Sequence, residues 1–499
     1  MRRIMISLPY RLAPAALAVL LSGCAIGPDF LRPLSLLPDR FTETKETVKA
    51  EPAVNPEVEQ AWWKHFKDPV LDELMDKALA QNADIRTAIA RVDQADALAR
   101  EAGASFFPEI DGQASGTRNR VSTMTATPMP AGTPTTRNGR AASLTTSYEV
   151  DVWGKVRRTN EAAKATALAS YYSRDAIRLS VAGLVTSNYL ALRSYDAQLI
   201  VANESLATRE ASLELVKTRV EAGLVSPLDQ HQAEGALAQT QAQVADLRRL
   251  RAVTLHQLAL LTGAPDLQIA PGDLRQLPMP PVPPAGLPST LVQGRPDVRQ
   301  AEETLVAANA NIGVAKAGYF PKFTLTGSLG SESKTMSDLF SAGASTWSLG
   351  LGLLMPVLDF GRTSARVDQA KALEQQSLVG YQNTLQTAFK EVNDALVGLR
   401  ENGEGERAQE KRVQATQKTL ELAQLRYEAG YSAFLEVLDA QRSANDALLD
   451  YVSTRQARLT SAVDLFKALG GGWKDDFKAE SLKNSGNDQA AAPVAKAGQ

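Results

Sequence analysis

The sequence predicts a mainly α-helical fold with a small β-sheet, in which one structural unit is built twice. Three glycine landmarks recur in the same order at one offset of 207 residues: Gly154 and Gly361, Gly223 and Gly430, and Gly263 and Gly470. A repeat of this length indicates one supersecondary unit present in two copies. Within each copy, long stretches of helical periodicity flank short stretches of strict alternation, so each copy combines helices with strands.

Composition excludes several classes of protein. The 499 residues carry 54 basic and 56 acidic side chains and a formal charge of −2, which gives no electrostatic basis for binding nucleic acid. The three histidines, His65, His231 and His256, lack the spacing of metal ligands, and there is no phosphate-binding loop or nucleophile elbow. We therefore expect no catalytic residues, no metal, and no cofactor apart from a covalent lipid, and we expect that the protein is not an enzyme.

Residues 1–23 have the features of a secretory signal peptide. Basic residues precede an apolar stretch from Leu12 to Leu21, and small residues lead to Cys24, which is the single cysteine. The Leu-Ser-Gly-Cys sequence resembles a bacterial lipoprotein signal, which implies cleavage before Cys24 and attachment of acyl chains such as palmitate to it. Ala25 then favours delivery to the outer membrane. A buried, inert thiol is the alternative, but the position of Cys24 argues against it. No later stretch is apolar enough for a membrane-spanning helix.

The first copy follows an extended N-terminal segment at residues 24–60. We assign the copy to residues 61–264, beginning with a helical stretch that is broken at Gln81-Asn82. Alternation on both sides of a polar loop at about 122–140 predicts a β-hairpin at about 109–153. Helical periodicity then predicts a long helical hairpin at about 155–263, whose first helix is about 100 Å long at 1.5 Å per residue.

A proline-rich linker at residues 265–294 separates the copies, because proline at this density cannot lie inside a helix. The second copy, residues 295–473, again predicts a helix, a β-hairpin at about 322–358 and a long helical hairpin at about 362–470. In its long helix, apolar residues repeat at heptad spacing and predict a coiled-coil seam. They are Leu378, Tyr381, Leu385, Ala388, Val392, Ala395 and Leu399. We expect the polar tail at 474–499 to be disordered.

The strands match a membrane β-sheet better than an ordinary half-buried sheet. At about ten residues, each is long enough to cross a tilted bilayer path, with apolar residues on one face and Gly, Ser and Thr on the other. Aromatic residues flank the strand ends and would form one girdle at one membrane interface. They are Phe106, Phe107, Trp153, Tyr319, Phe320 and Phe360.

Four strands per chain require oligomerisation. They cannot close a barrel, and an open sheet edge cannot face lipid. The smallest single barrels use eight strands, so two, three or four chains would each suffice, and the residues alone leave the number open. Both ends of each hairpin enter helices on the same side, which must be the periplasm in a secreted outer-membrane protein. Helices this long need partners along their whole length.

Several stretches together resemble a known family. They are Cys24–Phe30, Ala61–Pro69, Leu287-Pro288 with Gly294–Glu302, Val437–Arg442, and Ala468–Trp473. With them the chain resembles the TolC-like outer-membrane factors, in particular the lipidated, NodT-type efflux outer-membrane lipoproteins. The resemblance implies a homotrimer with a 12-stranded β-barrel, to which each chain contributes four strands. The β-barrel would lie in the lipid of the bacterial outer membrane and continue into a long periplasmic α-helical barrel.

The resemblance also implies a function and partners. The trimer would be a passive exit duct for small molecules, such as drugs and toxic compounds. A periplasmic adaptor (a membrane fusion protein) and an inner-membrane pump of the RND type would deliver them. The adaptor would dock at the two helix tips of each chain. These tips are Gly223, Leu224, Val225 and Ser226, and Gly430, Tyr431 and Ser432.

A periplasmic gate is implied in the same way by Leu435, Asp439 and Arg442. Without the family, Leu435 is a seam residue and Asp439 with Arg442 is an ordinary i,i+3 surface pair. Three other readings of the chain stay open at this point: a lipid-anchored scaffold without a pore, an envelope enzyme, and a duct for secreted protein. The transported molecules cannot be read from the sequence, because a duct has no substrate pocket.

Overall fold

A computed structural model describes residues 25–34, 37–38, 41, 61–124, 130, 132–281 and 289–473. The predicted signal peptide, Cys24, the C-terminal tail and most of the segment 24–60 lie outside these residues. The chain divides into two compact units. We call Met1–Leu34, Val92–Ser170 and Ala301–Tyr381 the sheet unit, and Ser35–Arg91, Tyr171–Gln300 and Gln382–Gln499 the helical unit.

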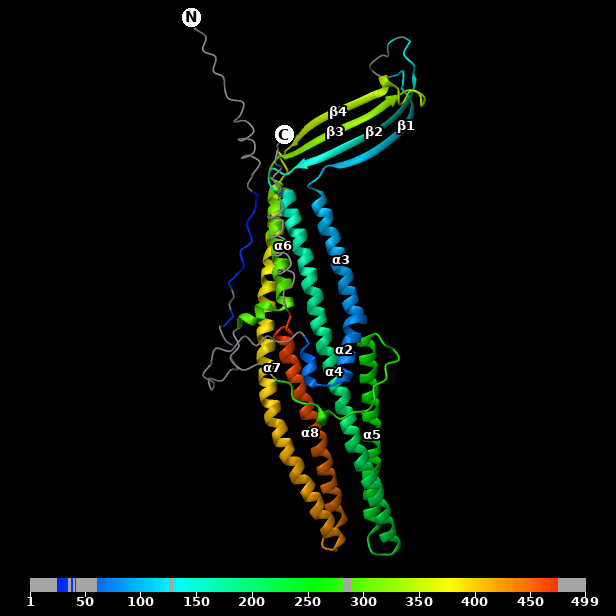
Figure 1. The fold of residues 1–499 in the computed structure, drawn as a ribbon, viewed down its shortest axis with the longest axis vertical. Helices are drawn as coiled ribbons and strands as arrows, with labels where there is room; N and C mark the ends of the chain where they lie inside the picture. Colours follow the sequence, from blue (N-terminus) through cyan, green and yellow to red (C-terminus); the bar gives the residue numbers. More distant parts are fainter. Residues whose placement is uncertain are drawn as a thin grey trace, which may run out of the picture. The chain divides into compact units, whose positions relative to one another are not determined.

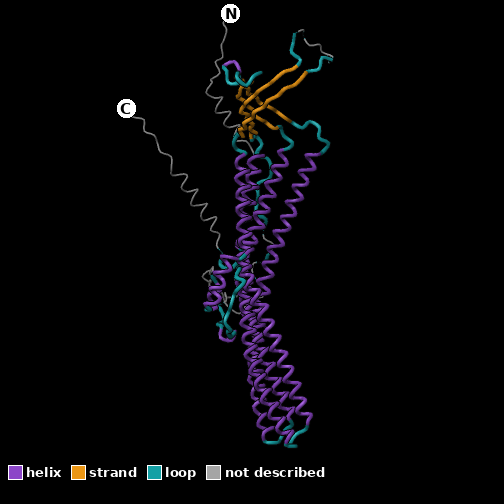
Figure 2. The backbone as a smooth tube through the Cα atoms, turned by 90° about the vertical axis from the view of Figure 1, so that its right-hand side faces the viewer, coloured by secondary structure: helices purple, strands orange, loops and turns teal. Residues whose placement is uncertain are grey.

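The sheet unit contains one four-stranded antiparallel sheet in the order β1-β2-β3-β4 (Figure 1). The strands are β1 (Glu109–Arg120), β2 (Thr136–Val150), β3 (Lys322–Ser333) and β4 (Ser345–Leu354). Each copy of the repeat contributes one hairpin, and β2 pairs with β3 to join the two copies. Figure 2 shows the same strands in orange.

One sequence expectation about the first hairpin is wrong. The polar loop was predicted to extend to Arg140, whereas β2 begins at Thr136, which pairs with Arg120, and Arg140 pairs with Gly116. β2 is therefore 15 residues long and not about ten. Its first residues are polar on both faces, so they lack the alternation that identifies a strand, and backbone pairing with β1 alone keeps them extended.

The helices of the first copy are α2 (Pro69–Gln81), α3 (Ala83–Ala104), α4 (Lys155–Glu221) and α5 (Pro227–Thr262). Those of the second are α6 (Pro296–Ala317), α7 (Arg362–Glu428) and α8 (Phe434–Ala468). Short 3₁₀ helices lie at Trp62–Phe66, Leu274–Gln276, Ser289–Gly294 and Ala342–Ala344. Asn82 separates α2 from α3 because its side-chain oxygen accepts hydrogen bonds from the backbone N–H groups of Asp84 and Ile85, which caps α3.

The duplication is visible in the long helices. α4 and α7 each have 67 residues, which corresponds to about 100 Å. Each begins after an aspartate that caps it: Asp151 accepts from the N–H groups of Val156 and Arg157, and Asp359 accepts from those of Gly361 and Thr363. In α7 the predicted seam residues Tyr381, Leu385, Ala388, Val392 and Ala395 are all buried.

The core of the helical unit lies where the short and long helices meet. Trp62 stacks on Phe466 with ring centroids 5.5 Å apart, and Leu71, Met75 and Tyr189 are fully buried beside them. The described part of the linker, 265–281, belongs to this core and does more than separate the copies. Arg193 donates to the carbonyl of Ala270 at 2.7 Å. The apolar residues between the prolines pack into the cluster: Leu267, Ile269, Leu274, Leu277 and Met279.

Candidate functional site

The sheet has one apolar face and one polar face. Strand partners lie directly opposite each other and share a face, so the register fixes the composition of both faces. One apolar row runs Gly112, Leu144, Leu329, Trp347, and another runs Tyr148, Leu325, Leu351. A row on the other face runs Asp111, Thr145, Ser328, Ser348. The division holds in this part of the sheet and ends toward the hairpin loops, where Arg118, Arg120 and Arg140 lie on the apolar face.

No described part of the chain covers the apolar face. Trp347 is 78% exposed and Leu349 is 81% exposed, with Leu351 and Leu353 similarly open. A contiguous apolar surface of this kind marks contact with a membrane or a partner. Burying one such side chain stabilises the assembly by about 1.5–3 kcal/mol. We therefore expect this face to be buried in the assembled protein.

The polar face is suited to water. Ser328 and Ser348 hydrogen-bond to each other across β3 and β4 at 2.8 Å, and on the same face Glu149 forms ion pairs with Lys155 and Lys322. Thr146, whose side chain lies on the apolar face, donates instead to the backbone carbonyl of Glu109 at 2.7 Å. Its hydroxyl is therefore satisfied without water, as a side chain facing lipid requires.

β1 and β4 are the edges of the sheet. Each pairs with one neighbour only, so one row of backbone N–H and C=O groups on each has no strand partner among the described residues. Such edges are templates for pairing with another strand. With its apolar face and open edges, the sheet is a segment of a closed barrel that other chains complete.

The six predicted girdle aromatics lie at one end of the sheet, where β1 and β3 begin and β2 and β4 end. Trp153 packs on Phe320 with ring centroids 4.7 Å apart, and its indole N–H donates to the carbonyl of Pro321 at 2.8 Å. Phe107, Tyr319 and Phe360 are exposed, and Phe106 is exposed to a smaller extent. Their contact with a membrane interface stays a prediction.

The two predicted helix tips have the same backbone geometry. At the first tip, the backbone N–H of Leu224 donates to the backbone carbonyl of Arg219 at 2.8 Å, and Gly223 adopts φ +69°. At the second tip, the backbone N–H of Tyr431 donates to the backbone carbonyl of Arg426 at 2.8 Å, and Gly430 adopts φ +78°. This is the glycine C-cap of a helix, which needs a residue without a Cβ. Leu224 and Tyr431 are exposed at the two turns.

The side chains that hold the tips differ. At the first tip, the Ser226 hydroxyl accepts from the N–H of Leu228 at 3.2 Å and caps α5, with Pro227 in the first turn. At the second, Ala433 offers no side-chain cap, and the buried hydroxyl of Ser432 has no hydrogen-bond partner among the described residues. Val225 of the first tip packs against the apolar cluster that joins the tips.

An apolar cluster joins the two tips. Phe434 is buried and its ring lies 5.4 Å from that of Tyr427. The Arg219 guanidinium of the first tip lies 4.8 Å above the Tyr427 ring, which is a cation–π contact between the copies. Leu213, Val216, Ala233 and Val437 complete the cluster.

The three predicted gate residues lie in the first turns of α8. Leu435 is 58% exposed. Asp439 and Arg442 form an ion pair with atoms 2.5 Å apart, and the side chains of both are 62% exposed. The residues 207 positions earlier are Leu228, Gln232 and Gly235, so the charge pair exists in the second copy alone. Within one chain, a pair this exposed contributes at most about 1 kcal/mol.

Sequence reasoning missed a buried polar layer between α4 and α8. Arg209 is only 7% exposed, and its Nε has no hydrogen-bond partner among the described residues. The pKa of Arg209 is lowered, mainly because burial disfavours its charge. The negative charge of Asp446 raises the pKa in part, and the positive charge of Arg442 lowers it further. Nearby, Gln441 donates to the Ser212 hydroxyl at 3.3 Å. The residues of this layer come from α4 and α8, which are far apart in the sequence, so no local pattern marks it.

Two further features are absent from the described part of the chain. No group of three or more His, Cys, Asp or Glu side chains there is arranged to hold a metal ion. No helix within the same residues has both the length and the apolarity of a membrane span.

Comparisons with known proteins agree with this geometry. The chain is 34% identical over 469 residues to the toluene efflux pump outer membrane protein TtgC of Pseudomonas putida, covering 93% of this chain and 95% of that protein. It is 31% identical over 471 residues to the cation efflux system protein CusC of Escherichia coli, covering 93% and 99%. The crystal structure of the Campylobacter jejuni CmeC outer membrane channel superposes with a TM-score of 0.83 at 26% identity, covering 92% and 98%.

These relatives confirm the fold class expected from the sequence, a trimeric channel with four strands and a helical barrel segment per chain. They also confirm the expected activity, since the relatives are outer-membrane channels of efflux systems and not enzymes. Residues 74–264 and 287–471 match the family described as outer membrane efflux protein, one match in each copy of the repeat. The chain therefore belongs to the outer membrane efflux protein family and is an outer-membrane efflux channel.

Proposed function

We propose that three copies of this chain form a passive exit duct for small molecules, which a periplasmic adaptor and an inner-membrane pump of the RND type deliver. The observation that carries the duct is the two-faced sheet with open edges. Three four-stranded sheets joined edge to edge would place every apolar row toward lipid and every polar row toward a water-filled lumen. The named relatives handle toluene and cations, which supports small cargo of varied chemistry.

Adjacent residues of β4 test the orientation of the sheet. Leu349→Arg places a charge on the apolar face, where it costs about 2–4 kcal/mol at mid-bilayer depth. Ser348→Arg is the matched control because it adds the same charge on the polar face. We expect Leu349→Arg to abolish heat-modifiable, trypsin-resistant trimers in the outer membrane. Ser348→Arg should preserve the trimers and alter single-channel conductance. Equal behaviour of the two variants would contradict the duct and favour a scaffold without a pore.

The tips are the proposed docking site for the adaptor. Leu224 and Tyr431 are apolar or aromatic, exposed, and carried on rigid turns, which suits a protein contact. Photo-crosslinking amino acids at positions 224 and 431 should capture one adaptor in cells, with the pump in the same complex. Position 210, exposed on α4 about three turns from the tip, is the control and should capture neither. Capture of a secreted protein in place of an adaptor would point to protein export.

The gate proposal concerns the second tip. Three symmetry-related copies of Leu435 would form an apolar constriction, and Asp439 with Arg442 would hold adjacent helix ends together. Because each exposed ion pair contributes only about 1 kcal/mol, an adaptor that contacts the open state better than the closed one could release them. Loss of both charges should therefore raise the open fraction, measured as single-channel conductance.

Lipid attachment at Cys24 is the remaining proposal, and it rests on the sequence before this residue. Cells fed a palmitate analogue should label the wild-type chain, and Cys24→Ser should remove the label. Labelling of the Cys24→Ser variant would contradict the proposal. The barrel should still insert in this variant, because the anchor adds to the apolar face and does not replace it.

A further inference from the structure

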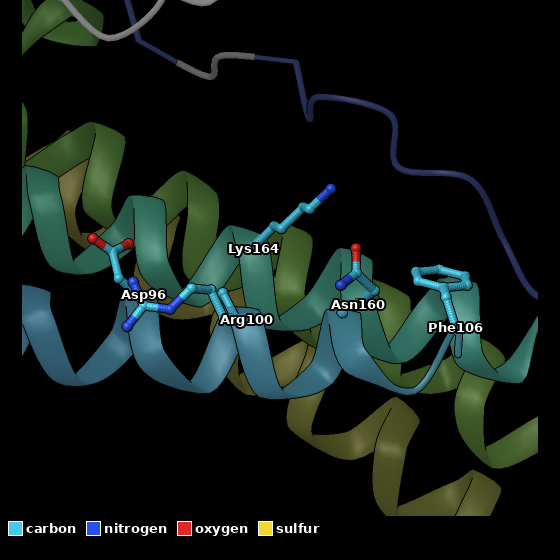
Figure 3. Close-up of a pocket in the computed structure, with 7 residues that line it drawn as sticks. Asp96, Arg100, Phe106, Asn160 and Lys164 are labelled. Carbon is cyan, nitrogen blue, oxygen red and sulfur yellow. The ribbon is translucent and has the colours of Figure 1, made fainter. Parts of the chain in front are cut away.

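A cavity of about 430 Å³ lies in the sheet unit between α3 and α4, close to the aromatic end of the sheet. Figure 3 shows five of its lining residues. Asp96 and Arg100 come from α3, Asn160 and Lys164 come from α4, and Phe106 follows the end of α3. Apart from Phe106, which belongs to the predicted aromatic girdle, neither the duct nor the gate uses these side chains.

The cavity has an excess of positive charge. Arg100 and Lys164 form no ion pair and no side-chain hydrogen bond with any residue that the structure describes. The nearby acidic groups are already engaged: Glu161 accepts from Arg158 at 2.8 Å, and Asp151 accepts from Arg157 at 3.1 Å. Asp96 is the acidic residue of the lining, and it has an interaction partner of its own. Two unpaired cations against one carboxylate favour an anionic occupant.

Asn160 adds a hydrogen-bonding group to the same site. The residue as a whole is only 6% exposed and lines the cavity, but its carboxamide is not among the buried polar atoms that lack a partner, so the amide stays accessible from the cavity. An accessible amide in the wall of a cavity can donate a hydrogen bond to an occupant. In Figure 3, Asn160 and Lys164 extend to the same side of α4, where an occupant could accept from both.

The shape of the site fits an amphiphile. Phe106, Asn160 and Lys164 also line a second cavity of about 410 Å³ between α4 and α6, in which Ala165, Leu168 and Val306 provide apolar surface. Arg157, Glu161 and Glu303 complete that lining. A polar head beside Arg100, Asn160 and Lys164 could therefore continue into an apolar chain beyond Phe106.

We propose that this site binds the phosphate of an anionic membrane phospholipid, with Arg100 and Lys164 as charge partners and Asn160 as a hydrogen-bond donor. The choice of a membrane lipid rests on the proposed duct, because that function places the aromatic end of the sheet at the periplasmic surface of the outer membrane. There, phospholipid headgroups would lie level with the cavity. Free inorganic phosphate has the same chemistry and is the alternative source.

Native mass spectrometry of the delipidated trimer tests the proposal, with phosphatidylglycerol and phosphatidylcholine added in equal amounts. We expect the wild type to retain phosphatidylglycerol at least tenfold over phosphatidylcholine, and Arg100→Gln with Lys164→Gln to reduce this preference to about one. The control Arg91→Gln with Arg178→Gln removes the same charge from the same two helices outside the cavity and should bind as the wild type does. Unchanged preference in the cavity variant would overturn the proposal.

Two further measurements separate the alternatives. If the wild type binds inorganic phosphate calorimetrically, the Gln variant does not, and no lipid preference is seen, then the source is free phosphate and the lipid assignment fails. Asn160→Leu removes the amide donor, so it should weaken phosphatidylglycerol binding several-fold. A variant with full lipid binding would remove Asn160 from the site.

Conductance distinguishes failure of this inference from failure of the duct. All of these variants should form conducting trimers in planar bilayers, because none alters the faces of the sheet or the tips. Conducting trimers without lipid preference contradict the lipid site alone. A wild type that neither trimerises nor conducts contradicts the duct.

Discussion

The two helix tips of the chain have the same backbone and different side chains. Both turns use a glycine C-cap with hydrogen bonds at matching positions, 207 residues apart. The first is fixed locally, by the Ser226 cap and Pro227. The second lacks a side-chain cap and is held by Phe434 and Tyr427, against the first tip. A locally fixed tip can stay rigid while a tip held by packing moves, so the difference favours placing the proposed gate in the second copy, while both tips remain the proposed docking site.

The largest effect should follow from removing the packing that holds the second tip. Phe434→Ala deletes a buried ring, which costs about 3–5 kcal/mol, and the loss should appear as faster hydrogen exchange around residues 427–440. Leu228→Ala removes an exposed side chain from the first turn of α5 and is the control, with an expected loss below 1 kcal/mol. Equal losses of stability in the two variants would contradict the claim that packing holds the second tip and not the first.

A second comparison between the copies concerns a buried charge cluster away from the tips. Glu406 accepts from Arg455 at 2.7 Å and from Arg458 at 2.6 Å, and its side chain is nearly inaccessible. The residue 207 positions earlier is Leu199, and the first copy carries its buried carboxylate at Asp196, which pairs with Arg251 and Arg193. Burial alone would raise the pKa of Glu406, but hydrogen bonds and charges from Arg458 and Arg455 outweigh it and hold the pKa below its ordinary value.

A carboxylate with a depressed pKa stabilises the folded state above its unfolded pKa, and the contribution is lost as pH falls through the folded pKa. The wild type should therefore lose melting temperature on acidification below about pH 4.5, the ordinary value for glutamate. Glu406→Gln should be less stable by about 3 kcal/mol at pH 7, because two partly buried guanidinium groups lose their charged partner. Its melting curve should depend less on pH in the acid range. A variant with the slope of the wild type would show that other carboxylates dominate.

The smallest effects should come from exchanging the helix caps. Ser226→Ala removes the cap of α5 and should cost about 1 kcal/mol. Ala433→Ser offers α8 the cap it lacks and should stabilise it by a similar amount. Hydrogen exchange at residues 226–230 and 433–437 checks both. If Ala433→Ser has no effect while Ser226→Ala destabilises, packing rather than capping determines the geometry of the second tip.

The sequence alone predicted the features that repeat. Glycines that require positive φ marked the turns, period two marked both hairpins, and heptad spacing marked the seam of α7. What it missed depends on contacts between distant residues. The linker is held in place by the hydrogen bond from Arg193 to the Ala270 carbonyl. The described N-terminal residues are held by two ion pairs, Arg158 with Asp29 and Arg32 with Glu302. No local pattern predicts such pairs. The buried Arg209 was missed for the same reason, since its environment comes from α8.

Single-channel conductance of Asp439→Ala with Arg442→Ala tests most directly the claim that the second tip gates the channel. The control is Asp246→Ala with Arg249→Ala, an ion pair on α5 with the same i,i+3 spacing, an N–O distance of 2.7 Å and similar exposure. The account predicts that the Asp439 and Arg442 variant conducts several-fold more than the wild type, while the control variant stays as closed as the wild type. A variant at the second tip that remains closed, or a control that opens equally, would contradict it.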